Sequence, residues 1–255
     1  MLDKFYTKKD VASLCIKLIP NIDNYDIIVE PSAGNGSFST QLKCISYDIE
    51  PEHPDIIKQD FLKLNVNFDG RVLFIGNPPF GPRSSLAKSF IRHCIELNAT
   101  TIAFILPDTF NKLTNQSVFP EDWHLLLVYK LNDNNFMVDN EEYYVPCSFY
   151  VWTKDMVDKD LREKSVPQCK EFAFMKRGSL DADFAINGNN GKVKNIQDIT
   201  NPKAEHYIYV QDRSQVKKIR SFFEQANYHF NSSVNGNNAW IGQQDILKYF
   251  YDNFY

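Results

Sequence analysis

The sequence is poor in the residues that form disulfides or hold metal ions. It has 255 residues but only five cysteines, an odd number, and none of them forms a C-x-x-C pair. A disulfide framework or a cysteine-bound zinc ion is therefore not expected, and the five histidines lack the spacing of metal ligands. We expect a protein without a metal, kept in a reducing, intracellular compartment.

Long apolar runs and a strong excess of charge are also missing. No apolar stretch approaches the length of a membrane span, and polar residues interrupt the stretch from Val11 to Ile19, unlike the core of a signal peptide. The net charge is −4, and only residues 165–220 are basic, with 10 Lys and Arg against 6 Asp and Glu. We expect no membrane association and no secretion. The basic segment could contact phosphates, but an ordinary solvated surface explains it equally well.

The sequence does contain a series of short apolar runs of strand length, together with two helical patterns. The helical patterns cover 11–18 and 85–97. The expected strands cover 26–30, 45–49, 55–58, 71–76, 101–106, 123–131 and 143–153. Strands that alternate with helices predict an α/β fold with a mostly parallel sheet. The last two runs predict an antiparallel hairpin at the edge of that sheet.

A turn of small residues follows the first strand. It starts at Glu30 and continues through Pro31, Ser32, Ala33, Gly34, Asn35, Gly36, Ser37 and Phe38. Glycines allow a sharp turn and a close approach of a ligand to the backbone. We therefore predict the nucleotide-binding corner of a doubly wound sheet, with a helix after the turn. The complete dinucleotide pattern G-x-G-x-x-G is absent.

Acidic residues follow the second strand. It ends in Asp48-Ile49-Glu50, where a carboxylate can accept hydrogen bonds from both hydroxyl groups of a ribose. Ile49 could then cover one face of an adenine. Further on, Asp60 offers an acceptor for an adenine amino group, with the aromatic Phe61 beside it. Taken singly, each acid is more often a solvated surface residue.

The run at 71–76 ends in the tetrapeptide Asn77-Pro78-Pro79-Phe80. The two prolines remove two N–H donors, which leaves carbonyl groups and the Asn77 side-chain oxygen as acceptors. An exocyclic amino group has two N–H donors to offer such acceptors, and Phe80 provides a flat face on which a base can stack. The alternative is a proline-stiffened turn without a ligand.

In this order, the motifs resemble those of amino-group methyltransferases that use S-adenosylmethionine. The nearest resemblance is to adenine-N6 DNA methyltransferases of the restriction-modification and phage type, and it covers about residues 4–155. Lys4-Phe5-Tyr6-Thr7 is similar to the segment that closes over the methionine end of the cofactor in that family. The resemblance implies a Rossmann-like class I methyltransferase sheet.

The resemblance also implies a reaction and its residues. A methyl group would pass from S-adenosylmethionine to the N6 amino group of adenine in DNA, with the base flipped into the pocket of the tetrapeptide. The implied catalytic residues are Asn77, Pro78, Pro79 and Phe80. The implied cofactor-binding residues are Tyr6, Thr7, Glu30, Pro31, Ser32, Ala33, Gly34, Gly36, Asp48, Ile49, Asp60 and Phe61. No metal is needed.

The chain is expected to have two parts. Residues 1–155 would form the catalytic domain, and residues 165–255 a small C-terminal module that is a candidate for target recognition in nucleic acid. This module contains two Asn-Gly-Asn-Asn tetrapeptides, at 187–190 and 235–238, which we interpret as hairpin turns rather than groove contacts. Its many aromatic residues are expected to form a core.

Several alternatives remain open at this point. An RNA adenine-N6 methyltransferase would share the same motifs, and Phe80 stands where the DNA enzymes usually have Tyr. A glutamine-N5 protein methyltransferase uses a similar tetrapeptide, but its glycine motif usually opens with Asp. Cytosine-N4 methylation and a cofactor-binding subunit without activity are further alternatives. The sequence predicts neither the recognition site nor the oligomeric state.

Overall fold

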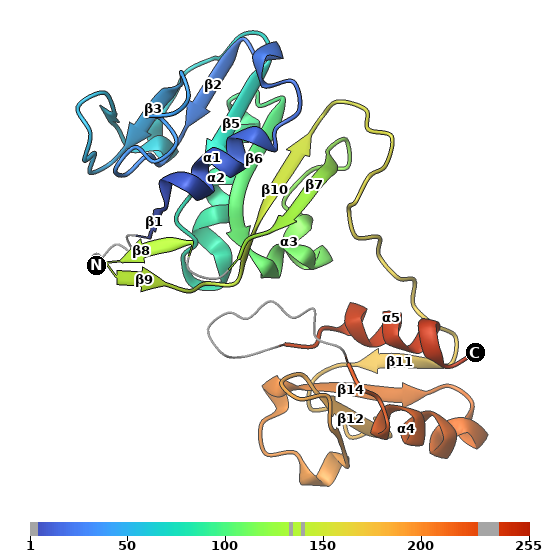
Figure 1. Cartoon of the computed structure of the whole chain (residues 1–255). Coiled ribbons are helices and arrows are strands. Elements are labelled where there is room, and N and C mark those ends of the chain that lie inside the picture. Colours follow the sequence, from blue (N-terminus) through green and yellow to red (C-terminus); the bar gives the residue numbers. More distant parts are fainter. Residues whose placement is uncertain (1–4, 133–134, 139–140, 229–239) are drawn as a thin grey trace. The chain divides into compact units, whose positions relative to one another are not determined.

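The computed structural model describes residues 5–132, 135–138, 141–228 and 240–255. The chain forms two compact units, Met1–Glu163 and Lys164–Tyr255 (Figure 1). Residues 156–163, which lie between the expected domains 1–155 and 165–255, thus belong to the first unit. The second Asn-Gly-Asn-Asn tetrapeptide and Lys4 lie outside the described residues. No helix in the described ranges is long and apolar enough to cross a membrane.

The first unit is built on a seven-stranded sheet with the order β4-β3-β2-β5-β6-β10-β7. Its strands are β2 (Ile27–Glu30), β3 (Ile45–Asp48), β4 (Ile57–Lys58), β5 (Val72–Gly76), β6 (Thr101–Pro107), β7 (His124–Lys130) and β10 (Cys147–Thr153). β4, β3, β2, β5 and β6 run parallel, whereas β10 pairs antiparallel with both β6 and β7. The predicted fold class, with its parallel sheet and terminal antiparallel hairpin, is confirmed.

Both faces of this sheet are buried. Successive side chains of a central strand point alternately into two apolar clusters, one on each face. On β5, Phe74 points into one core cluster and Leu73 and Ile75 into the other. Helix α2 (Ser85–Glu96) covers the first face through Phe90 and Ile91, and helix α1 (Lys9–Lys17) covers the second. Continuous apolar strands of this kind are typical of parallel sheets that have helices on both sides.

The remaining helices of the first unit are short. They are α3 (Leu113–Gln116) and the 3₁₀ turns η1 (Ile22–Asn24), η2 (Phe61–Lys63), η3 (Pro82–Ser84) and η4 (Asp108–Asn111). The helix expected after Gly36 was wrong, because residues 34–41 form consecutive turns instead. The hydroxyl of Thr40 donates to the Gly36 carbonyl at 2.7 Å and that of Ser37 to Asn35 Oδ1 at 2.8 Å. Such local side-chain bonds compete with a regular helix.

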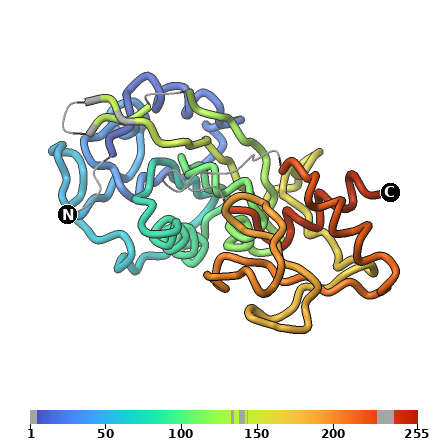
Figure 2. Tube along the Cα trace, turned by 90° about the horizontal axis from the view of Figure 1, so that it is seen from below, coloured from blue at the N-terminus to red at the C-terminus, as the bar shows by residue number. Residues whose placement is uncertain are grey.

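A small second sheet holds the start of the chain. Strand β1 (Tyr6–Thr7) pairs antiparallel with β8 (Phe136–Val138), which in turn pairs with β9 (Glu141–Tyr143). Figure 2 shows this hairpin, in yellow-green, beside the blue N-terminal segment. The pairing brings together parts of the chain that are about 130 residues apart.

The second unit is an antiparallel sheet covered by two helices. The strand order is β11-β14-β12-β13, formed by β11 (Phe172–Met175), β12 (Phe184–Asn187), β13 (Val193–Lys194) and β14 (Glu205–Val210). The helices are α4 (Val216–Glu224) and α5 (Gln243–Asn253), and the 3₁₀ turns are η5 (Ile196–Asp198), η6 (Pro202–Ala204) and η7 (Arg213–Gln215). β12 and β13 confirm the hairpin predicted at 187–190. Phe223 and Phe250 lie in its apolar core, as expected.

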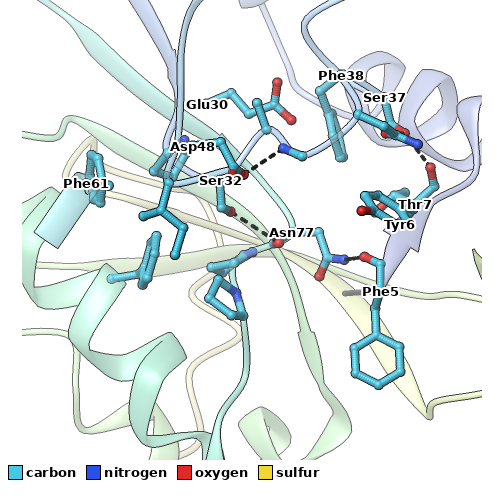
Figure 3. A pocket seen from close by; sticks show the side chains of 18 of the residues that line it. Phe5, Tyr6, Thr7, Glu30, Ser32, Ser37, Phe38, Asp48, Phe61 and Asn77 are labelled. Atoms are coloured by element: carbon cyan, nitrogen blue, oxygen red, sulfur yellow. Dashed lines mark hydrogen bonds between the residues drawn. The ribbon is translucent and has the colours of Figure 1, made fainter. Parts of the chain in front are cut away.

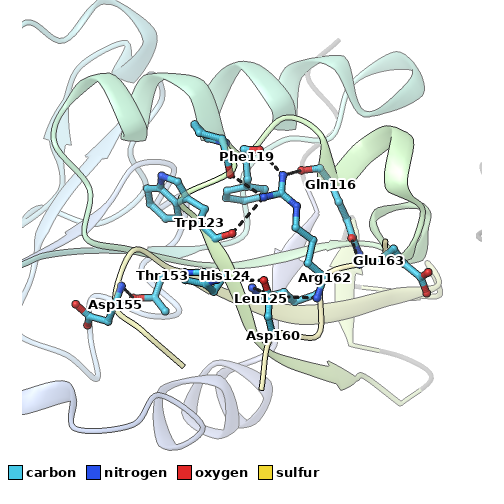
Figure 4. A network of polar contacts seen from close by, with 11 residues as sticks. Gln116, Phe119, Trp123, His124, Leu125, Thr153, Asp155, Asp160, Arg162 and Glu163 are labelled. Atoms are coloured by element: carbon cyan, nitrogen blue, oxygen red, sulfur yellow. Dashed lines mark hydrogen bonds and ion pairs between the residues drawn. The ribbon is translucent and has the colours of Figure 1, made fainter. Parts of the chain in front are cut away.

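Arg162 anchors the end of the first unit through hydrogen bonds (Figure 4). Its guanidinium donates hydrogen bonds to the backbone carbonyls of Gln116, Phe119, Pro120 and Trp123. The same group lies over the ring of Trp152, 5.4 Å from its centre. A planar fork with five donors can satisfy several carbonyls at once.

We expect Arg162→Met to lower the free energy of unfolding by about 2–4 kcal/mol, because buried carbonyls lose their charged donor. Arg162→Lys should recover only part of this loss, since an ammonium group cannot reach four carbonyls in one plane. Urea denaturation followed by circular dichroism measures the change. Arg92→Met, at an exposed arginine of the same unit, is the control and should stay within about 0.5 kcal/mol. Equal losses at the two positions would contradict the role of Arg162.

Candidate active site

A pocket opens at the carboxyl ends of β2, β3 and β5, where β1 and α2 also reach it (Figure 3). In parallel sheets this edge gathers the residues that follow each strand. Of the residues predicted from the sequence, the pocket is lined by Tyr6, Thr7, Glu30, Pro31, Ser32, Ala33, Gly34, Asp48, Ile49, Phe61, Asn77, Pro78, Pro79 and Phe80. Motifs spread over 75 residues thus face one space.

Two of the predicted residues do not line it. The amide of Gly36 donates to the Ala33 carbonyl at 2.8 Å, so this glycine shapes the turn behind the pocket. Asp60 begins the 3₁₀ turn η2, where its side chain accepts a hydrogen bond from the Leu62 amide at 3.1 Å. Its carboxylate also pairs with Lys63 at 3.0 Å. Asp60 therefore lies outside the residues that line the pocket, and its contact with an adenine amino group stays a prediction.

The glycine turn approaches the N-terminal strand closely. Gly34 has a φ of 54°, and a Cβ atom added to it would lie 3.3 Å from the ring of Tyr6. A larger residue would be strained in this conformation and would push against the ring. The hydroxyl of Tyr6 bonds to Glu52, whose own amide donates to the Gly34 carbonyl at 3.0 Å. Tyr6 is thus fixed across the turn.

Asp48 holds the same turn from the other side. Its Oδ2 accepts a hydrogen bond from the Gly34 amide at 2.8 Å, and its Oδ1 accepts one from the Glu50 amide at 2.8 Å. Each carboxylate oxygen has a second lone-pair direction, so both can still accept a hydroxyl group of a ligand. Next to it, Ile49 is 42% exposed although it is apolar, and it lines the pocket.

Glu30 is the most deeply buried acid of the pocket, with 1% of its surface exposed. Burial raises the pKa of Glu30 to about 8, against the lowering effect of a hydrogen bond that the Ser39 amide donates to Oε2. The nearby charge of Asp48 raises this pKa further. Glu30 is therefore largely protonated near neutral pH.

The strand β1 is bound to two of the loops that line the pocket. Ser37 of the glycine turn donates to the Thr7 carbonyl at 2.5 Å. Nδ2 of Asn77, at the end of β5, donates to the Phe5 carbonyl at 3.2 Å. The Asn77 backbone carbonyl accepts a hydrogen bond from the Ser32 hydroxyl at 3.3 Å. These bonds, drawn in Figure 3, join the glycine turn, β1 and the tetrapeptide into one frame.

The bond to Phe5 fixes the orientation of the Asn77 amide. Because Nδ2 is engaged by a carbonyl, Oδ1 takes the opposite direction. Oδ1 is buried and forms no hydrogen bond with any described residue. An acceptor that is buried without a partner costs free energy, and it marks the place where a ligand with N–H groups would be stabilised.

Phe80 is fixed by the helix that follows it. Its carbonyl accepts hydrogen bonds from the amides of Leu86 and Ala87 at 3.1 and 3.2 Å, at the start of α2. Gly81 allows this tight return, because its φ is 67° and an added Cβ would lie only 2.8 Å from the Leu86 Cβ. The ring of Phe80 can therefore keep one position at the pocket.

Six lining residues were not among the predicted site residues: Phe5, Asn35, Ser37, Phe38, Glu50 and Phe90. Phe5 contributes a backbone carbonyl, which has no signature in a sequence. Phe90 of α2 lines the pocket and stacks on Phe61 with their ring centres 5.4 Å apart. Its apolar helical position predicted burial but not a place in the pocket. The two rings form an apolar wall on which a flat ligand could lie.

The thiol of Cys147 lies away from the pocket. Cys147 lies buried in β10, and burial raises the pKa of its thiol well above the ordinary value, so that it stays protonated. It is a core residue. Within the described ranges, no group of three or more His, Cys, Asp and Glu residues could hold a metal ion.

Comparisons with known proteins return structural similarities alone. No protein-family model and no curated protein matches the chain. A proposed RNA methyltransferase from Pyrococcus horikoshii is similar with a TM-score of 0.47 and 14% identity, over 61% of this chain and 88% of that one. The Type IIL restriction-modification enzyme MmeI, in complex with DNA, is similar with a TM-score of 0.37 and 10% identity, over 72% of this chain and 41% of that one. The chain thus spans less than half of the length of MmeI.

The raised pKa of Glu30 predicts how stability depends on pH. Between the ordinary value of 4.5 and about 8, the folded chain holds one proton more than the unfolded chain. The free energy of unfolding should therefore fall as the pH rises through this window, by up to about 5 kcal/mol, and level off above it. Glu30→Gln should remove this slope.

Urea denaturation at several pH values between about 5 and 9 measures the slope. Glu50→Gln, at an exposed residue of the same pocket, is the control and should keep the wild-type dependence. A slope that persists in Glu30→Gln would mean that another group causes it.

Proposed function

We propose that this protein transfers a methyl group from S-adenosylmethionine to the N6 amino group of adenine in DNA. The observation that carries the proposal is the Asn77 amide: Nδ2 is held by the Phe5 carbonyl, and Oδ1 is buried in the pocket wall without a partner. An acceptor fixed in this way suits a ligand that brings N–H donors. The aromatic ring of Phe80 beside it suits a flat base.

The chemistry follows from what these acceptors do to an amino group. The lone pair of an adenine amino nitrogen is delocalised into the ring, which makes the nitrogen a poor nucleophile. Asn77 Oδ1 and the Pro78 carbonyl would each accept a hydrogen bond from one N–H group of this nitrogen. Both acceptors would also stabilise the positive charge that develops on the nitrogen. The nitrogen then forms a bond to the methyl carbon while the carbon–sulfur bond breaks, and one amino proton leaves to water. S-adenosylmethionine, when bound, supplies the electrophilic methyl group.

The other end of the pocket suits this methyl donor. Asp48 can accept the two ribose hydroxyls, and the exposed Ile49 can cover the adenine of the donor. The turn at Gly34 passes close to the Tyr6 ring, and the buried Thr7 Oγ1 forms no hydrogen bond with a described residue. The apolar wall of Phe61 and Phe90 completes the site.

The second unit supports a polymer substrate. It folds as a separate module, and residues 165–220 carry 10 Lys and Arg against 6 Asp and Glu. We assign target recognition to this module. RNA is the second candidate substrate, because Phe80 takes the place of the tyrosine that is usual in the DNA enzymes that this chain resembles.

Asn77→Ala tests the central assignment. It removes the oriented acceptor, so we expect kcat to fall by at least about a hundredfold while the affinity for S-adenosylmethionine changes by less than about threefold. Labelled methyl transfer to duplex DNA, single-stranded DNA and RNA in parallel, with mass spectrometry of the nucleosides, measures the activity and identifies the product.

Asn115→Ala is the matched control, because its side chain also donates to a backbone carbonyl, that of Thr109 at 2.8 Å, but does not line the pocket. It should remain active. If Asn77→Ala kept more than about a tenth of the activity, a loss below about 1.4 kcal/mol, the assignment would be wrong. N6-methyladenine in RNA alone would favour the second candidate, and label in neither polymer would refute the proposal.

The donor end of the pocket has its own test. Asp48→Asn keeps an oxygen for the Gly34 amide but loses the negative charge, and we expect the affinity for S-adenosylmethionine to fall by about tenfold, measured by calorimetry. Asp60→Asn should leave it within about twofold, because Asp60 caps a turn outside the pocket. The opposite result would restore the adenine contact that the sequence predicted for Asp60.

A further inference from the structure

A strained turn directly follows the tetrapeptide. Gly81, Arg83 and Ser84 all have positive φ values, of 67°, 53° and 59°. Glycine adopts such a backbone freely, but the left-handed region is unfavourable for arginine and serine. Two adjacent residues of this kind are uncommon, and strained backbone of this sort gathers at active sites and ligand clamps.

The turn is held from both sides. The Phe80 carbonyl binds the amides of Leu86 and Ala87, so the chain leaves and returns at nearly the same point. Ser84 is buried, with 1% of its surface exposed, and its hydroxyl bonds to that of Thr109 at 3.3 Å. The backbone of Arg83 is therefore fixed between the pocket residue Phe80 and the first turn of α2.

The side chain of Arg83 has no visible use inside the protein. It is exposed, and no acidic side chain in the described part of the chain pairs with it. A strained position that served only packing would be expected to bury or bond its side chain. Here a strained backbone position carries a guanidinium that is exposed to solvent, three residues after Phe80.

Two more unpaired cations follow on α2. Lys88 and Arg92 are four residues apart and therefore lie on the same face of the helix, where like charges destabilise it. Partial burial, and in addition the charge of Arg92, lower the pKa of Lys88. No described acid forms an ion pair with either residue. An excess of positive charge thus begins at Arg83 and continues along the helix.

The pocket itself has the opposite character. Its acidic lining residues are Glu30, Asp48 and Glu50, and no lysine or arginine among the described residues lines it. A nucleotide whose base enters at Phe80 would leave its sugar and phosphates outside. Negative charge would then arrive where Arg83 begins the run of unpaired cations.

We infer that Arg83, supported by Lys88 and Arg92, binds the phosphodiester backbone beside the nucleotide whose base enters the pocket. This inference rests on the proposed function, because it takes the pocket to receive a base of a polymer. A guanidinium can bind a phosphate through two parallel hydrogen bonds. Such contacts set the register of the strand without reading its sequence, so they would serve DNA and RNA alike.

Arg83→Asn tests the inference without strain, because asparagine tolerates the left-handed backbone and folding should be preserved. Fluorescence anisotropy of the full chain with labelled duplex DNA, single-stranded DNA and RNA gives the affinity at several salt concentrations. We expect binding of the methylated polymer to weaken by about tenfold. The slope of log affinity against log salt should fall by about 0.7 to 0.9 for one lost phosphate contact.

Arg83→Lys should recover most of the salt slope, because it restores the charge, whereas Lys17→Gln, at an exposed residue of α1, should change neither quantity. KM for the nucleic acid should rise with the loss of affinity in Arg83→Asn. Unchanged affinity and slope in Arg83→Asn, with a wild type that methylates nucleic acid, would overturn this inference and leave the proposed function standing. If the wild type bound nucleic acid through Arg83 but methylated none, this inference would stand and the proposed function would be overturned. If the wild type bound no nucleic acid, the inference and the proposed function would both be overturned.

Discussion

A side-chain amide has two chemically opposite ends, and the Asn77 amide is oriented by one hydrogen bond, from Nδ2 to the Phe5 carbonyl. Turned by half a rotation, it would set its oxygen against that carbonyl and present N–H donors to the pocket. Such a site would repel an amino group instead of accepting it. The polarity of the pocket therefore depends on the position of a backbone carbonyl at the beginning of the chain.

That carbonyl is held by contacts from distant parts of the sequence. Thr7 pairs with Phe136 of β8, Ser37 donates to the Thr7 carbonyl, and the Tyr6 ring packs against Gly34. The strand is too short to be stable by itself, since two residues form few ladder bonds. Its place is set by the loops it joins, so a shift of the glycine turn on ligand binding would reach Asn77 through Phe5.

A feature of the fold or the site could be predicted from the sequence where neighbouring residues determine it. The alternating apolar positions of β5 and the tetrapeptide after it are local, and they predicted both the sheet and the edge where Asn77 lies. Asp60 also fitted its motif, but the Leu62 amide two residues away takes up its side chain. The part played by Phe5 rests on a backbone atom, and the sign of φ at Arg83 follows from tertiary closure of the turn. Neither leaves a pattern in the residue types.

The net charge of −4 is a poor guide to what this chain binds, because charge acts over short distances. At physiological salt, exposed charges are largely screened beyond about 8 Å, so a phosphate meets its neighbours rather than the whole protein. The acids of the pocket lie among the residues to which we assigned the methyl donor, and burial raises the pKa of Glu30 to about 8, so that it is largely uncharged near neutral pH. Arg83 pairs with no acidic side chain in the described part of the chain. A local arrangement with acids inside the pocket and cations beside it is compatible with the polyanionic substrate that we propose for this acidic chain.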